Sequence, residues 1–111
     1  MKYSYELKKD PFGITRIVLP DEISILSDFV EDISTQEEMD EYIRYIKNVL
    51  EGVYNDFEIT LNTTSVSIRK DVTIAEHHYR IDEPCENTIE TKEFLELMLI
   101  WEERIIDESR E

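Results

Sequence analysis

The sequence predicts an α+β fold in which an antiparallel sheet of about five strands is combined with two helices, in the order ββ(β)-α-βββ-α. Short stretches of alternating apolar and polar residues follow one another, rather than alternating one by one with helices. Two longer stretches have apolar residues at spacings of three and four, as amphipathic helices do. Only two glycines and three prolines occur in 111 residues, which indicates regular elements joined by short turns in a single domain, residues 1–111.

The first predicted element is an antiparallel hairpin over residues 2–19. In residues 2–8, aromatic and aliphatic side chains alternate with polar ones, which predicts a half-buried strand. The segment Asp10-Pro11-Phe12-Gly13 has the residue types of a tight turn, because aspartate, proline and glycine suit its first, second and last positions. Residues 14–19 are rich in β-branched residues and form the second strand.

Residues 22–33 satisfy neither period cleanly, so a third strand and an irregular acidic segment are both open. Ser34-Thr35-Gln36-Glu37 has the form of a capping box, in which the Ser34 hydroxyl accepts from the amide at the third helical position. One apolar stripe then predicts a helix over residues 36–51, and Gly52 ends it.

The second half of the chain predicts three strands and a helix. The strands are expected at residues 57–61, around residues 66–68, and from residue 72 towards residue 79. Residues 80–87 are polar and are expected to form a loop. Thr91 is expected to cap a helix over residues 92–106, whose broad apolar stripe suits either a covered sheet or a dimer contact.

Negative charge is concentrated in one part of the chain. The protein has 27 acidic and 12 basic residues, a net charge of −15, and residues 17–43 contain no lysine or arginine. Crowded like charges raise the free energy of the folded state, so we expect this stretch to bind a cationic protein, with aromatic side chains as anchors. A surface that only keeps the protein soluble is the alternative. The candidate binding residues are Asp21, Glu22, Asp28, Phe29, Glu31, Asp32, Glu37, Asp40, Glu41, Tyr42 and Tyr45.

Motifs for catalysis or for metal binding are missing from the sequence. There is no nucleophile elbow, phosphate-binding glycine loop, HExxH pattern or calcium loop. His77 and His78 are adjacent on a predicted strand and so point to opposite faces, which prevents them from chelating one metal. We therefore expect no enzyme activity, no cofactor and no metal.

The same composition bounds the location and the kind of partner. Cys85 is the only cysteine, the N-terminus does not resemble a signal peptide, and no apolar run reaches the roughly 20 residues of a membrane span. The acidity disfavours nucleic acid and anionic membranes as direct partners, because phosphates would be repelled. We expect a soluble, cytoplasmic protein.

The chain resembles an immunity protein of a bacterial toxin–immunity system of the contact-dependent growth inhibition type. The resemblance lies in its small size, strong acidity, single cysteine and lack of a catalytic set of residues. The resemblance implies a protein that binds a basic toxin, often a nuclease, at its active cleft or an adjoining surface and neutralises it. It is a resemblance of overall profile and assigns no residues.

A weaker resemblance, of sequence pattern, is to the small acidic YacL family. The segments that carry it are YEL at residues 5–7, GITR at 13–16, EITL at 58–61, VSIR at 66–69 and EFL at 93–95. It supports the α+β order and implies little about activity. Two other functions stay open: an acidic nucleic-acid mimic that blocks a DNA- or RNA-binding protein, and a soluble housekeeping protein.

Overall fold

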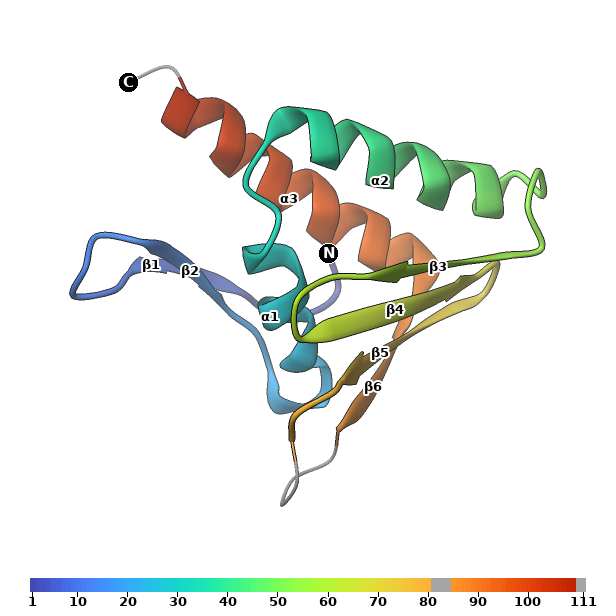
Figure 1. Cartoon of the computed structure of the whole chain (residues 1–111), viewed down its shortest axis with the longest axis horizontal. Coiled ribbons are helices and arrows are strands. Elements are labelled where there is room, and N and C mark those ends of the chain that lie inside the picture. The colour runs from blue at the N-terminus through green and yellow to red at the C-terminus, as the bar shows by residue number, and fades with distance from the viewer. Residues whose placement is uncertain (81–84, 110–111) are drawn as a thin grey trace.

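The computed structural model describes residues 1–80 and 85–109, and it has helices packed on one face of an antiparallel sheet (Figure 1). The elements are β1 (Glu6–Lys9), β2 (Thr15–Val18), the 3₁₀ helix η1 (Asp21–Ile23), α1 (Ile25–Glu31), α2 (Gln36–Leu50), β3 (Asp56–Thr60), β4 (Thr64–Arg69), β5 (Val72–His77), β6 (Glu86–Glu90) and α3 (Thr91–Ser109). Strands β3 to β6 form a four-stranded sheet in chain order, and β1 and β2 form a separate two-stranded sheet. The α+β class with antiparallel strands is confirmed, whereas the single five-stranded sheet and the pair of helices are wrong in detail.

The N-terminal hairpin is present where it was predicted. The Asp10 carboxylate accepts the backbone N–H groups of Phe12 and Ile14, at 2.9 and 3.0 Å. Gly13 has φ +79°, a conformation that favours glycine. The half-buried first strand is wrong, because all four residues of β1 are exposed. The hairpin extends beyond the four-stranded sheet, and β2 contributes Ile17 to the core (Figure 1).

Both readings of residues 22–33, a strand or an irregular segment, are wrong. Leu26, Phe29, Val30 and Ile33 have the helical spacing i, i+3, i+4, i+7, and all four are fully buried. No side chain caps the start of α1 locally. Instead the side-chain oxygen of Asn87, in β6, accepts the backbone N–H of Ile25 at 2.8 Å. The start of this helix is therefore stabilised by a residue far along the chain, which no local pattern could indicate.

Helix α2 agrees with the prediction for residues 36–51, but its cap lies one residue later than expected. Thr35, not Ser34, is the N-cap, and its hydroxyl oxygen accepts the backbone N–H of Glu38 at 3.2 Å. The Thr35 hydroxyl in turn donates to the Glu38 carboxylate at 3.0 Å. Gly52, with φ +82°, follows the end of the helix as predicted.

Strands β3, β4 and β5 match the predictions, and β6 was missed. Residues 86 and 87 of β6 fall inside the predicted loop at 80–87; residues 81–84 of that loop lie outside the described residues. Ile89 is the only fully buried residue of β6. Because the remaining residues are polar, the strand conformation depends on pairing with β5 rather than on a local pattern.

Helix α3 follows β6 without a connecting loop, and Thr91 is its first residue. The Thr91 hydroxyl donates to the Arg69 carbonyl oxygen and lies 3.0 Å from the Thr73 hydroxyl oxygen. The backbone N–H of Thr91 donates to the Asp71 carbonyl oxygen at 3.0 Å. Thr91 thus joins the start of the helix to the β4–β5 turn.

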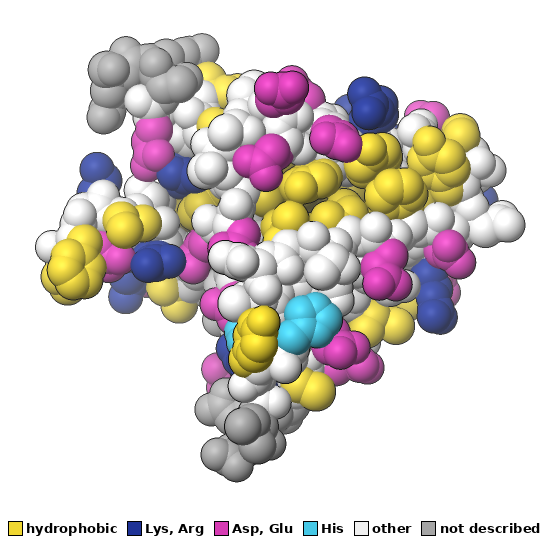
Figure 2. All heavy atoms as spheres, viewed as in Figure 1, with side chains coloured by type: hydrophobic (Ala, Val, Ile, Leu, Met, Phe, Trp, Pro, Cys, Tyr) yellow, Lys and Arg dark blue, Asp and Glu magenta, His cyan; other side chains and the backbone are white. Residues whose placement is uncertain are grey.

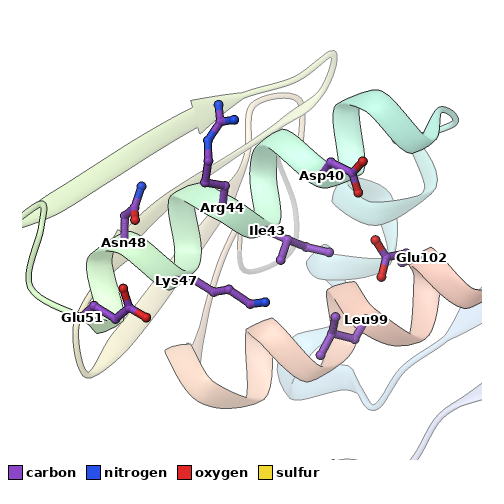
Figure 3. A pocket seen from close by; sticks show the side chains of 8 residues that line it. All are labelled: Asp40, Ile43, Arg44, Lys47, Asn48, Glu51, Leu99 and Glu102. Carbon is purple, nitrogen blue, oxygen red and sulfur yellow. The ribbon is translucent and has the colours of Figure 1, made fainter.

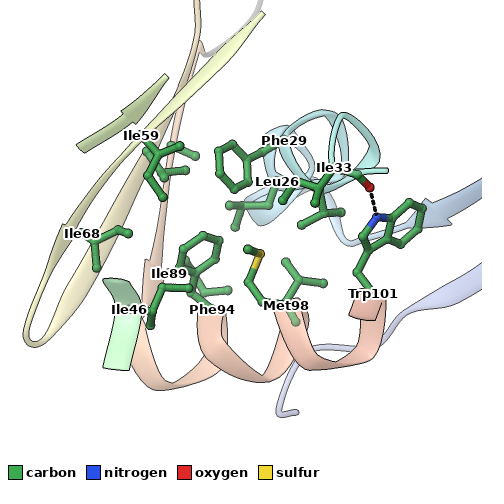
Figure 4. Close-up of a cluster of buried hydrophobic side chains, with 14 of the residues drawn as sticks. Leu26, Phe29, Ile33, Ile46, Ile59, Ile68, Ile89, Phe94, Met98 and Trp101 are labelled. Carbon is green, nitrogen blue, oxygen red and sulfur yellow. Dashed lines mark hydrogen bonds between the residues drawn. The ribbon is translucent and has the colours of Figure 1, made fainter. Parts of the chain in front are cut away.

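The core lies between the inner face of the sheet and the helices (Figure 4). The rings of Phe29 and Phe94, from α1 and α3, have centroids 5.8 Å apart. The Trp101 indole N–H donates to the Ile33 carbonyl oxygen at 2.9 Å, which connects α3 to the segment after α1. Strand residues that face these helices in Figure 4 are Ile59, Ile68 and Ile89.

The N-terminal segment contacts β6 through Glu90. The Tyr3 hydroxyl donates to the Glu90 carboxylate at 2.5 Å, and the Lys2 ammonium forms an ion pair with it. The Lys2 ammonium, and then the Tyr3 hydroxyl, lower the pKa of Glu90 to about 2.

Candidate protein-binding surface

Helix α2 presents part of the predicted acidic stretch to solvent. Its buried side, formed by Met39, Ile43, Ile46 and Val49, fixes the rotation of the helix against α3 and the sheet. The helical period leaves three acidic side chains of this helix exposed. Figure 2 shows acidic side chains over the outer side of α2. We call these residues the α2 acidic face: Glu37, Asp40 and Glu41.

The acidic residues of α1 are engaged inside the fold. The Glu31 carboxylate accepts the backbone N–H of Ile17 at 2.9 Å and pairs with the Arg16 guanidinium at 3.3 Å. Its side chain is only 14% exposed. Asp28 lies 3.5 Å from the Arg80 guanidinium and 3.6 Å from the Nε2 atom of His77. These contacts connect α1 to β2 and to the end of β5, so the charges of Glu31 and Asp28 already face cationic or polar groups.

The other acidic candidates lie near the same helix. Partial burial of the Asp32 carboxyl raises its pKa, and the nearby charge of Asp28 raises it further. Asp21 and Glu22 are exposed on η1, which contacts β6. The predicted stretch is therefore divided between the outer side of α2 and the region of η1 and α1.

The three aromatic candidates have different positions. Phe29 is fully buried in the core, so the prediction of a surface anchor at this position is wrong. Tyr42 and Tyr45 lie half-buried on α2. The Tyr45 hydroxyl donates to the Glu41 carboxylate at 2.5 Å, and this hydrogen bond raises the pKa of the tyrosine.

Two aromatic residues that the sequence did not single out extend this surface. The Phe57 ring, on β3, stacks on Tyr45 with centroids 4.1 Å apart and an interplanar angle of 22°. The Tyr54 ring lies 5.6 Å from Phe57. We call Tyr45, Tyr54 and Phe57 the aromatic seam, because they join α2 to the start of β3. Figure 2 shows hydrophobic side chains gathered between α2 and the sheet. The alternation of residues 57–61 placed Phe57 on a strand, but only the tertiary fold brings it to Tyr45.

A groove between α2 and α3 mixes both signs of charge (Figure 3). Lys47 extends from α2 towards α3, and Leu99 is 41% exposed in the groove. Acidic and basic side chains both line it. Arg44 borders this groove and also lies beside the three carboxylates of the α2 acidic face. The groove is lined by Asp40, Ile43, Arg44, Lys47, Asn48, Glu51, Leu99 and Glu102.

The two histidines contact different carboxylates. The Nε2 atom of His77 faces Asp28, whereas the Nδ1 atom of His78 lies 3.8 Å from Glu76. Among residues 1–80 and 85–109, no cluster of three or more histidine, cysteine or acidic side chains is placed to hold a metal ion.

No model of a protein family, no curated protein and no solved structure matches this chain. Within the described part of the chain, every helix is too short or too polar to cross a bilayer. The fold and the surface define a small acidic α+β domain whose α2 acidic face adjoins partly exposed aromatic rings.

Proposed function

We propose that this chain is an immunity protein that binds and neutralises a basic toxin, with a nuclease as the leading candidate. The observation that carries the proposal is the α2 acidic face. Its three carboxylates are exposed, and within the described residues none of them forms an ion pair with a lysine, an arginine or a histidine. The proposal also implies action in the cytoplasm, where a toxin that has entered the cell would be neutralised.

The chemistry of nucleases explains why their cationic surfaces fit such a face. A nuclease contacts phosphate groups through lysine and arginine, and exposed carboxylates can occupy the same cations. Opposite potentials on two surfaces speed their association and make it salt-dependent. Tyr45, half-buried at the edge of the face, is suited to supply the desolvated contact that charges alone do not provide.

The test begins with the gene's neighbourhood. A basic protein encoded beside this gene is expressed in bacteria with and without the chain, and growth is measured. We expect the chain to restore growth and to bind the purified toxin more weakly as salt rises from about 50 to about 300 mM. If no neighbouring basic protein is toxic, or if the chain does not relieve toxicity, the proposal is wrong.

A pair of charge reversals locates the surface. Glu37→Lys with Glu41→Lys alters the α2 acidic face, and association with the toxin should become about tenfold slower or more. The matched control is Glu103→Lys with Asp107→Lys, which reverses two exposed acidic residues at the same i, i+4 spacing on α3. Equal effects of the two pairs would show that only net charge matters and would exclude the α2 acidic face as the interface.

The nucleic-acid mimic is less well supported. A mimic needs carboxylates spaced like phosphates along one elongated face. Here Arg44 and Lys47 interrupt the acidic side of α2, and Arg16 and Arg80 pair with the acidic residues of α1. A toxin-type partner needs only a local patch.

A further inference from the structure

Strand β3 is an edge of the four-stranded sheet, and part of its backbone faces outward. The backbone N–H of Leu61 donates to the Thr64 carbonyl oxygen at 2.9 Å, so this pair is hydrogen-bonded across the β3–β4 hairpin. Hydrogen-bonded and non-hydrogen-bonded pairs alternate along an antiparallel ladder. In the observed register the next hydrogen-bonded pair is Ile59 with Val66.

The intervening residues therefore direct their peptide groups away from the sheet. These residues are Glu58 and Thr60, and both are exposed. In residues 1–80 and 85–109, β4 is the only strand that pairs with β3. The N–H and C=O groups of Glu58 and Thr60 are thus available to a further strand.

The surroundings of this edge favour a cationic strand. On the helix side lies the aromatic seam, with the Glu41 carboxylate bound to Tyr45. The Arg44 guanidinium already lies 5.5 Å from the centre of the Tyr45 ring, so the Glu41 carboxylate, rather than this ring, is the group that attracts a further cation here. On the other face of the sheet, the Glu58 side chain is exposed. Both faces beside the edge are therefore suited to lysine or arginine.

The edges of β1 and β6 lack this combination. Strand β1 is exposed but carries Lys8 and Lys9, which repel a cationic segment. Strand β6 directs Glu86 and Thr88 outward by the same alternation, since the His77 N–H donates to the Cys85 carbonyl oxygen. Strand β6 is in contact with η1, whereas the aromatic seam lies at the opposite edge of the sheet, beside β3.

We propose that the β3 edge binds an extended basic segment of the partner protein as a fifth strand. The segment's main chain would pair with the peptide groups of Glu58 and Thr60, and its side chains would alternate between the two faces. Those on the helix side meet Tyr45 and Glu41, and those on the other side meet the Glu58 carboxylate. A second copy of this chain fits poorly, because it would bring another net charge of −15 and a second exposed Glu58 carboxylate to the same edge. This inference rests on the proposed function and specifies how the toxin docks.

Amide hydrogen exchange of the ¹⁵N-labelled full chain tests the strand pairing. The probe is an acetylated and amidated peptide of alternating arginine and threonine, and its comparison is a peptide of alternating glutamate and threonine. At saturation, the arginine peptide should slow the exchange of the Glu58 and Thr60 amides about tenfold or more, and leave Thr88 unchanged. The glutamate peptide should protect none of them. Unchanged exchange at Glu58 and Thr60 with the arginine peptide would overturn the inference.

Two matched proline variants test the edge itself. Thr60→Pro removes an outward N–H without breaking the β3–β4 ladder, and should weaken binding of the arginine peptide about tenfold. Thr88→Pro makes the same change on the opposite edge and should have no effect on binding. Thermal melting checks that both variants fold; if Thr60→Pro does not, Glu58→Lys replaces it and should weaken binding through charge. Equal binding by both edge variants would refute the pairing.

The two proposals fail separately. If the arginine peptide protects the Glu58 and Thr60 amides but the chain relieves no toxin's effect on growth, the strand pairing is supported and a toxin is excluded as the natural partner. Relief of toxicity without protection of Glu58 and Thr60 would keep the immunity function and overturn this mode of docking.

Discussion

Substitution of Glu31 tests whether some acidic residues of residues 17–43 stabilise the fold rather than remain available for binding. Its carboxylate accepts the Ile17 backbone N–H at 2.9 Å and is only 14% exposed. A hydrogen bond to a charged group contributes about 1.5–3 kcal/mol, and the half-exposed Arg16 adds little to this. We expect Glu31→Ala to lower the free energy of unfolding by about 2 kcal/mol. Glu31→Gln, which keeps an acceptor oxygen for Ile17, should lower it by about 1 kcal/mol.

Urea unfolding followed by circular dichroism measures the difference. With a slope of about 1.3 kcal/mol per molar urea for a domain of this size, the alanine variant should unfold about 1.5 M earlier than the wild type. Glu37→Ala is the control, because that residue is exposed on α2 and has no ion-pair partner within the described residues. Its melting temperature should stay within about 2 °C of the wild type. If Glu31→Ala and Glu37→Ala unfold at the same urea concentration, the assignment of a structural role to Glu31 is wrong.

Three further predictions concern stability. Trp101→Phe leaves the buried Ile33 carbonyl oxygen without its indole donor and should cost about 2 kcal/mol in urea unfolding; an unchanged midpoint would contradict this. Thr35→Ala should cost about 1 kcal/mol and Ser34→Ala almost nothing, and the reverse order would restore serine as the cap of α2. The pKa of Glu90 in the folded state, about 2, lies below the ordinary glutamate value of 4.5. The contribution of Glu90 to stability is therefore complete well above pH 4.5 and is lost as pH falls towards 2. The wild type should therefore lose more stability over this range than Glu90→Gln does, and parallel stability curves for the two proteins would contradict the shift.

The elements that the sequence predicted well contain their own signals. Helix α2 has its apolar stripe, a threonine cap and a terminal glycine within 18 residues of chain, residues 35–52. Helix α1 is different. Its stripe becomes clear only when Leu26 is included, and its first amide is bound by Asn87 from β6. Strand β6 likewise has a single buried residue, Ile89, and takes its conformation from β5. Local pattern predicts an element when its stabilising contacts are local, and it fails when they come from distant residues.

The same reasoning applies to the acidic residues. Nothing near Asp28 in the sequence distinguishes it from Glu37, and the difference arises because Arg80, 52 positions later, packs beside Asp28. For α2 the buried stripe alone determines which acidic residues face outward, so exposure there was readable from the helical period. The open edge of β3 was not readable, because which strand lies at the edge of a sheet depends on the complete strand order. Variants that probe binding should therefore be placed on α2 and β3, where the loss of a charge or an amide N–H leaves the core intact. Substitutions at Glu31 or Asp28 would instead combine any loss of binding with a loss of stability.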